Sequence, residues 1–167
     1  GYRDDVEKYA GNRKEQDAIR YILSYGWASA GHRIQFAKFT GSTFKAAEAG
    51  NAFRTLEKTL LLELVYPQST TTLPMLPDLK KSPKLLWLDT GLVNYVAGMQ
   101  EDLLFGKDAD ELWNGGIAEH VVGQELLGAS VVFGEKRMFW VRDAKNSQAE
   151  IDFLISYKSH LLPIEVK

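Results

Sequence analysis

Residues 149–167 read AEIDFLISYKSHLLPIEVK and contain two short apolar runs, which predict neighbouring β-strands. Every second side chain of a strand points to the same face, so Glu150 and Asp152 are expected to point together, as are Glu165 and Lys167. Two carboxylates and an amine can therefore converge. Such a trio suits metal-dependent cleavage of a phosphodiester, because carboxylates bind a divalent cation and a lysine can orient or activate the attacking water.

The same pattern has a second interpretation, in which the charges belong to ordinary half-buried strands. The run 161–166 is mostly apolar and favours an interior strand, where charge is costly unless it is paired or bound to a metal. An ion pair between Glu165 and Lys167 beside Asp152 would remove that cost without catalysis. The pattern alone leaves both the metal site and the ion pair open.

Composition indicates a soluble globular protein. The chain has 167 residues, 45% of them hydrophobic, and no cysteine, which excludes disulfides and thiolate metal sites. No apolar run approaches the roughly 20 residues that span a bilayer, and the charged start is unlike a secretory signal. We therefore expect a cytoplasmic protein with no membrane partner.

Charge is distributed unevenly and favours two modules. Residues 31–84 carry eight basic and four acidic side chains, whereas residues 85–167 carry seven basic and thirteen acidic ones. A basic segment can contact phosphates, and an acidic segment needs cations. We place a first module at residues 12–89 and a second at residues 90–167.

The first module is predicted to contain a helix-turn-helix. Apolar residues at helical spacing predict a helix over 12–25, which Gly26 ends. A short helix is expected from Thr43 to Ala49, closed by Gly50, and a further helix over Asn51–Leu62. Two helices joined by a tight glycine turn are typical of this motif.

Two strands and a loop extend the motif to a winged form. LLELVYP (61–67) and KLLWLD (84–89) read as strands, and the proline-rich stretch between them reads as a long exposed loop. Together they predict a β-wing.

Basic residues make this module a candidate for DNA binding. Arg54 and Lys58 are four apart and share the outward face of the second helix, so they can reach bases or phosphates. Lys80 and Lys81 on the wing can touch the DNA backbone. Winged helices also dock onto proteins, so a protein partner stays open.

The second module is predicted to begin with a helix of residues 89–98, capped by Asp89 or Thr90, and an acidic loop over 99–111. A longer helix over 115–130 and a strand meander with a polar turn at 143–148 are expected to follow. Glu119 and Glu125 are six apart, roughly 240° around a helix, so at most one can join the site. A helix across such a sheet is the layout of a restriction-endonuclease-like core.

Five motifs, in order along the chain, carry a family resemblance. They are KSPKLLWLDTGLVNYVAG (81–98), the helix pattern G-x-x-x-E-x-x-V-x-x-E-L from residue 115, FWVR (139–142), AEIDFLI (149–155) and PIEVK (163–167). From about residue 15 to the end, the chain resembles the C-terminal domain of unknown function of prokaryotic AAA-type P-loop ATPases.

The resemblance implies an N-terminal ATPase followed by an α/β (α+β) pair of modules: a winged helix and a PD-(D/E)xK nuclease-like core. It implies an acidic site of Glu119, Asp152, Glu165 and Lys167, with Mg²⁺ or Mn²⁺ held by Asp152 and Glu165. The chain has no phosphate-binding loop motif, so ATP is expected only through an N-terminal domain absent from it. The core is expected to be truncated after Lys167.

We expect a module that binds DNA or a partner protein beside its own ATPase domain, with an altered nuclease-like site. An active metal-dependent DNA endonuclease is the alternative, and a purely structural or antitoxin-like appendage is a third reading.

Overall fold

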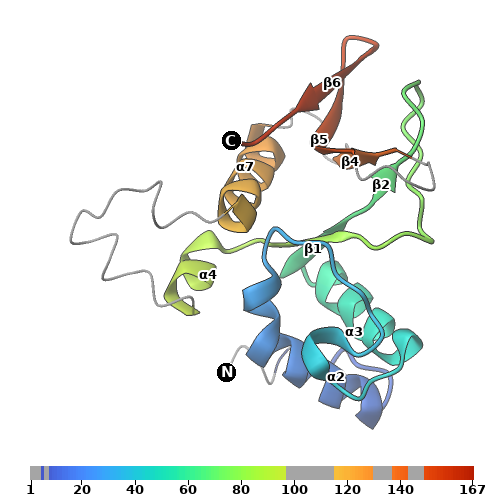
Figure 1. Ribbon diagram of the computed structural model, residues 1–167. Coiled ribbons are helices and arrows are strands. Elements are labelled where there is room, and N and C mark those ends of the chain that lie inside the picture. The colour runs from blue at the N-terminus through green and yellow to red at the C-terminus, as the bar shows by residue number, and fades with distance from the viewer. Residues whose placement is uncertain (1–4, 6–7, 97–114, 130–136, 143–148) are drawn as a thin grey trace.

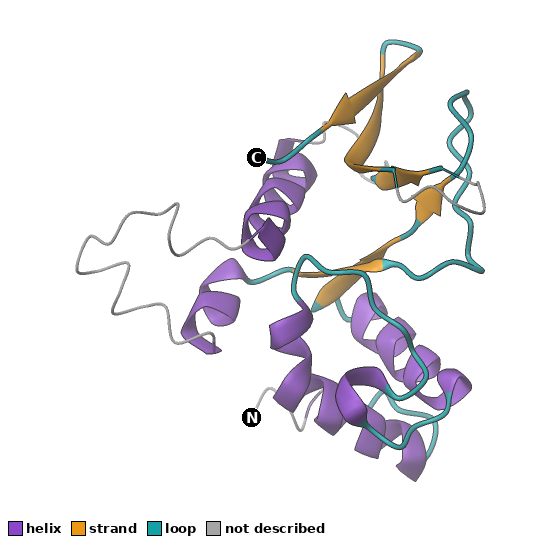
Figure 2. Ribbon diagram, in the orientation of Figure 1, coloured by secondary structure: helices purple, strands orange, loops and turns teal. Residues whose placement is uncertain are grey.

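The computed structural model describes residues 5, 8–96, 115–129, 137–142 and 149–167, and it shows a mixed α+β protein (Figures 1 and 2). Within these residues the helices are α2 (Arg13–Tyr25), α3 (Ala46–Lys58), α4 (Thr90–Val96) and α7 (Gly115–Ala129), with 3₁₀ turns η1 (Gly26–Ser29) and η2 (Phe39–Gly41). The strands are β1 (Leu62–Val65), β2 (Pro67–Gln68), β3 (Lys84–Trp87), β4 (Met138–Val141), β5 (Glu150–Tyr157) and β6 (His160–Ile164). The predicted loop 99–111 and turn 143–148 lie outside the described residues.

The predicted helix over 12–25 is confirmed as α2. Asn12 caps it, because its side-chain oxygen accepts a hydrogen bond from the backbone amide of Glu15 at 3.0 Å, and Gly26 is its C-cap. The apolar residues of α2 are buried at one face and share a core with α3, which packs beside it (Figure 1). They are Ala18, Ile19, Ile22 and Leu23.

The expected break at Gly50 is wrong, because α3 runs through this glycine as one helix and ends at Lys58. A single glycine costs a helix only about 1 kcal/mol relative to alanine, and the alanines around it are the best helix formers. The side chain of Glu48 also accepts from the backbone amide of Lys45 at 3.0 Å, which starts the helix before the glycine. The described chain therefore has no tight glycine turn here, and Leu62 belongs to a strand.

The two strands predicted on either side of the proline-rich stretch are confirmed as β1 and β3. They pair antiparallel, with Leu62 opposite Trp87 and Val65 opposite Lys84. The Trp87 ring stacks on Trp27 of η1 with ring centroids 3.7 Å apart, which fixes the strand pair to the helices. The proline-rich stretch is not a free loop at its start, because β2 pairs parallel with β4 of the second sheet.

The second sheet has the strand order β2-β4-β5-β6. The expectation of an interior strand near residues 161–166 is wrong, because β6 pairs only with β5 among the described residues and its side chains are largely exposed. Lys158 and Ser159 form the connecting turn with positive φ angles of 46° and 63°. The turn between β5 and β6 projects away from α2 and α3, while the other end of this hairpin lies beside α7 (Figure 1).

Helix α7 packs tightly between the two sheets at Gly123. A Cβ atom at this position would lie 2.7 Å from Leu86 Cδ1 on β3 and 2.9 Å from Phe153 Cζ on β5, both closer than van der Waals contact allows. Both neighbours belong to a buried cluster that also contains Val65, Phe139 and Val141. The missing side chain therefore allows α7 to touch both sheets.

Gly123→Ala is expected to lower the free energy of unfolding by about 1–3 kcal/mol, because the added methyl group must push buried side chains aside. Urea unfolding monitored by circular dichroism measures the change. Gly128→Ala, on the same helix with nothing within 4 Å, is the matched control and should leave stability unchanged or raise it by up to about 1 kcal/mol. Equal effects at both positions would contradict the close approach.

Candidate functional site

Lys84 gathers three carboxylates around its side chain. It lies on β3 and is 2% exposed. Its Nζ atom is 2.6 Å from Glu119 Oε2 on α7, 2.9 Å from Glu150 Oε1 and 3.4 Å from Asp152 Oδ1, the last two both on β5. These residues, together with Arg33, are called the Lys84 cluster below.

Neighbouring groups hold the cluster in place. Arg33 Nη1 lies 3.4 Å from Glu150 Oε2, and the backbone amide of Val166 donates to Asp152 Oδ2 at 2.9 Å. The Lys84 ammonium also lies 5.0 Å from the ring centroid of Phe139, within cation–π range. Each carboxylate of β5 thus has a second partner, which restricts its orientation.

The cluster carries one more carboxylate than it has cations. Burial alone would lower the pKa of Lys84, but its hydrogen bonds to Glu119 and Glu150 outweigh that effect, so its pKa is raised and the ammonium stays charged. Burial raises the pKa of Glu119, Lys84 opposes the rise, and the charges of Asp152 and Glu150 add to it. The pKa of Glu119 is therefore raised above its usual value.

The structure brings together some of the predicted site residues and separates others. Asp152 and Glu119 meet at Lys84, and Glu150 points with Asp152 as the strand alternation predicts. Glu125 is exposed, as expected if only one glutamate of α7 joins the site.

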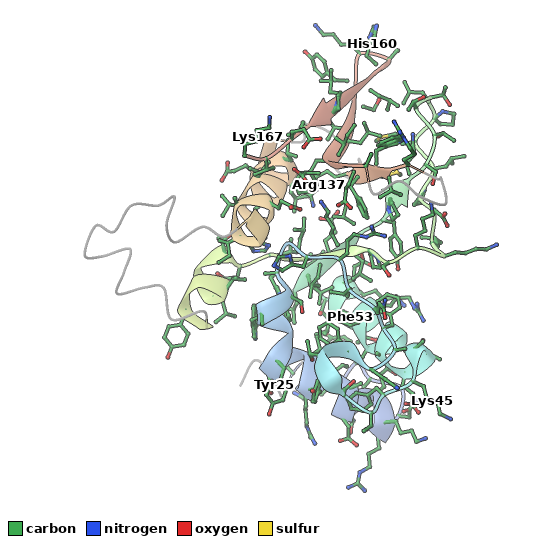
Figure 3. All side chains as sticks on the ribbon, viewed as in Figure 1. Tyr25, Lys45, Phe53, Arg137, His160 and Lys167 are labelled. Atoms are coloured by element: carbon green, nitrogen blue, oxygen red, sulfur yellow. The ribbon has the colours of Figure 1, made fainter. Side chains whose placement is uncertain are left out.

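Glu165 and Lys167 lie apart from the Lys84 cluster. Both are exposed and follow the end of β6. Figure 3 shows Lys167 at the C-terminal end of the chain. The amine that meets the carboxylates is Lys84 and not Lys167. Within the described ranges, no group of three or more His, Asp or Glu side chains is arranged to hold a metal ion. Catalysis and metal binding by the predicted residues stay predictions.

The sequence-based prediction leaves Lys84 out of the site, and it places Glu150 on the same face as Asp152 without including it in the site. The available signal was a lysine at the head of the apolar run KLLW, where all four strand residues prove buried. Charge in a buried strand is costly unless it is paired, so a lysine in this run requires acidic partners.

The residues predicted to contact DNA lie in two parts of the chain, helix α3 and the proline-rich segment. Arg54 and Lys58 are exposed on α3, one helical turn apart, and Lys80 is exposed in the proline-rich segment. Lys81 is half-buried, and its Nζ donates to Ser69 Oγ at 2.8 Å. Lys81 is therefore engaged within its own segment, and DNA contact by all four stays a prediction.

Two further ionisable groups are buried near α7. His120 is 0% exposed, neither ring nitrogen has a hydrogen-bond partner among the described residues, and burial lowers its pKa to about 4. Arg137 forms an ion pair with Glu63 on β1 and donates to the carbonyl of Gly123, and burial lowers its pKa to about 10 (Figure 3). Arg137 thereby connects the first strand pair to α7.

The fold is that of a mixed α+β protein, and the Lys84 cluster lies where α7 meets β3 and β5. The family model described as domain of unknown function DUF8612 matches residues 1–103, which is more than half of the chain. The chain belongs to that family. A second model, domain of unknown function DUF4143, matches residues 114–167.

No curated protein and no solved structure matched the chain. Within the part of the chain that the structure describes, no helix has both the length and the apolar character needed to cross a membrane. The Lys84 cluster joins the two matched segments, since Arg33 and Lys84 come from the first and the three carboxylates come from the second.

Proposed function

We propose that the chain is a binding module of a larger cytoplasmic AAA-type ATPase, and that its nuclease-like site is altered so that it does not cleave DNA. The observation that carries this proposal is the Lys84 ammonium, which lies among the carboxylates at 2.6–3.4 Å. A tethered cation thus occupies the point at which these acids would otherwise bind a free one. DUF4143 is commonly found with AAA ATPases, which supports the proposed context.

Under this proposal, the N-terminal and C-terminal parts of the chain are variants of two known architectures. Helices α2 and α3 with the β1–β3 pair would be a winged-helix variant, and α7 with β4–β6 would be a PD-(D/E)xK nuclease-like core. ATP would bind to the N-terminal domain of the larger protein. DNA or a protein would be the partner of this module.

An active Mg²⁺- or Mn²⁺-dependent endonuclease is the second candidate. It is favoured by the approach of Glu119, Glu150 and Asp152 to one point, since carboxylate oxygens are the ligands that these ions use. Glu119 and Asp152 would hold the ion, and it would have to displace Lys84 Nζ. That displacement removes a buried ammonium from its partners and opposes metal binding.

The intact protein incubated with supercoiled plasmid and Mn²⁺ or Mg²⁺ is expected to leave the DNA uncut, because the Lys84 ammonium occupies the position between the carboxylates that a metal ion would need. Gel electrophoresis of the plasmid measures nicking. Cleavage that disappears in Asp152→Ala and persists in Glu125→Ala, an exposed acid on the same helix as Glu119, would overturn the binding-module proposal in favour of the nuclease.

A further inference from the structure

The oxygen atoms around Lys84 Nζ resemble the ligands of a hard metal ion. Besides the three carboxylates, the main-chain carbonyl of Asp152 accepts from this ammonium at 3.3 Å. Oxygens of Glu119, Glu150 and Asp152, at least four in all, thus lie 2.6–3.4 Å from Nζ and are called the oxygen shell below. An ammonium has three N–H donors, whereas Ca²⁺ takes roughly 6–8 oxygen ligands. The oxygen shell therefore offers more acceptors than the lysine can use.

The two carboxylates of β5 are oriented as the ligands of a metal usually are. Glu150 directs Oε1 towards Lys84 Nζ and Oε2 towards Arg33. Asp152 directs Oδ1 towards the same Nζ, while its Oδ2 accepts from the amide of Val166. In metal sites, such outer hydrogen bonds hold the ligating oxygens in place. The two acidic side chains are 26% and 17% exposed, so an ion from solvent can reach them.

The charge of the oxygen shell also suits a divalent ion better than an ammonium. Three carboxylates face the charges of Lys84 and Arg33, which leaves one negative charge in excess. A divalent cation in place of the ammonium would bring the sum with Arg33 to zero. As the chain stands, the metal ion that the family resemblance implies does not fit. The ammonium occupies its place, and no group of acids in the described ranges is arranged to hold a metal.

We propose that the Lys84 ammonium takes the place of a divalent cation of the size of Ca²⁺, and that the oxygen shell binds such an ion once a neutral residue replaces the lysine. This inference rests on the proposed altered site and deepens it by naming the ion that the lysine replaces. Glu119 Oε2, at 2.6 Å, already lies at the edge of the roughly 2.3–2.6 Å range of Ca²⁺–oxygen bonds. Mg²⁺ would require every oxygen to approach to roughly 2.0–2.1 Å in near-ideal octahedral geometry.

Isothermal titration calorimetry of the intact chain with CaCl₂ tests the proposal. Lys84→Ala is expected to bind Ca²⁺ with a dissociation constant of about 0.1–1 mM, the range of weak calcium sites in proteins. The wild type and Lys14→Ala should bind it at least roughly tenfold more weakly, because both keep the buried ammonium. Lys14 is the matched control, since it also pairs with a glutamate, Glu48, at 3.3 Å, but its side chain is 78% exposed. Lys84→Ala should bind Mg²⁺ at least roughly tenfold more weakly than Ca²⁺.

Two further substitutions, each made together with Lys84→Ala, locate the bound ion. Asp152→Asn removes one negatively charged ligand and is expected to weaken Ca²⁺ binding at least roughly tenfold. Glu125→Gln, at an exposed acid on the same helix as Glu119, should leave Ca²⁺ binding unchanged.

Loss of the ammonium destabilises the fold, so thermal unfolding followed by circular dichroism accompanies the titrations. At about 10 mM CaCl₂ the unfolding temperature of Lys84→Ala should rise by about 3–10 °C, as mass action predicts for this affinity. The unfolding temperatures of the wild type and Lys14→Ala should not rise in this way. Lys84→Gln, which keeps a long side chain and adds an amide oxygen, is measured in parallel and should also be stabilised by Ca²⁺.

Four outcomes would each overturn the inference. They are Ca²⁺ binding by the wild type as tight as by Lys84→Ala, tighter binding of Mg²⁺ than of Ca²⁺, Ca²⁺ binding that Asp152→Asn leaves unchanged, and Lys84→Ala and Lys84→Gln chains that neither bind Ca²⁺ nor unfold at a higher temperature in its presence. None of them changes the plasmid assay, which uses the wild type. A failed replacement of an ion by Lys84 and a failed binding-module proposal are therefore distinguishable.

Discussion

Lys84→Met is expected to lower the free energy of unfolding by about 3–5 kcal/mol, the cost typical of removing one partner from a buried ion pair. The substitution keeps an unbranched apolar stem in the strand but leaves Glu119, Glu150 and Asp152 close together with Arg33 as their remaining cation. Repulsion between the three carboxylates and the loss of the hydrogen bonds from Lys84 Nζ both destabilise the folded chain. Urea unfolding at neutral pH measures the effect.

A second substitution separates charge from packing. Adding Glu119→Gln to Lys84→Met removes one unpaired carboxylate, so the double variant should be more stable than Lys84→Met alone. Lys80→Met, at an exposed lysine, should change stability by no more than about 0.5 kcal/mol. If Lys84→Met has the same small effect as Lys80→Met, the cluster does not contribute to the stability of the fold.

As the pH is lowered from 7 to below 4, the protonation of His120 is expected to lower the free energy of unfolding by about 3 kcal/mol. Burial lowers the pKa of His120 from 6.5 to about 4, so between these values the unfolded chain binds a proton that the folded chain does not. The contribution of neutral His120 is complete above about pH 6.5 and is lost as the pH falls towards 4. Each pKa unit corresponds to about 1.4 kcal/mol.

The carboxylates also titrate in this range, so the His120 effect must be measured as a difference. Urea unfolding at several pH values is compared between the wild type and His120→Leu, which cannot be protonated at this position. The two stability curves should converge or cross as the pH falls, whereas His32→Leu, at an exposed histidine, should run parallel to the wild type. A His120→Leu curve that runs parallel too would mean that His120 is not buried as a neutral side chain.

Local patterns predicted much of the secondary structure and half of the candidate site. The period of two placed Glu150 with Asp152, and the period of 3.6 allowed only one of Glu119 and Glu125 to join them. Both rules depend on a few consecutive residues, so no distant contact could change them. The break at Gly50 failed because a single glycine is a weak signal, and a packed helix can absorb its cost.

The amino-acid order alone was enough to give the chain its mixed α+β class, its α2 helix, its β1–β3 pair and the common face of the acids on β5. It could not supply the amine among those acids, since Lys84 is 68 residues away from Asp152 and reaches it only when α7 and β5 pack on β3. Periodicity describes which way a side chain points, whereas contact between distant elements depends on how their apolar faces pack. For that reason the arrangement of three carboxylates around one ammonium is a property of the folded chain.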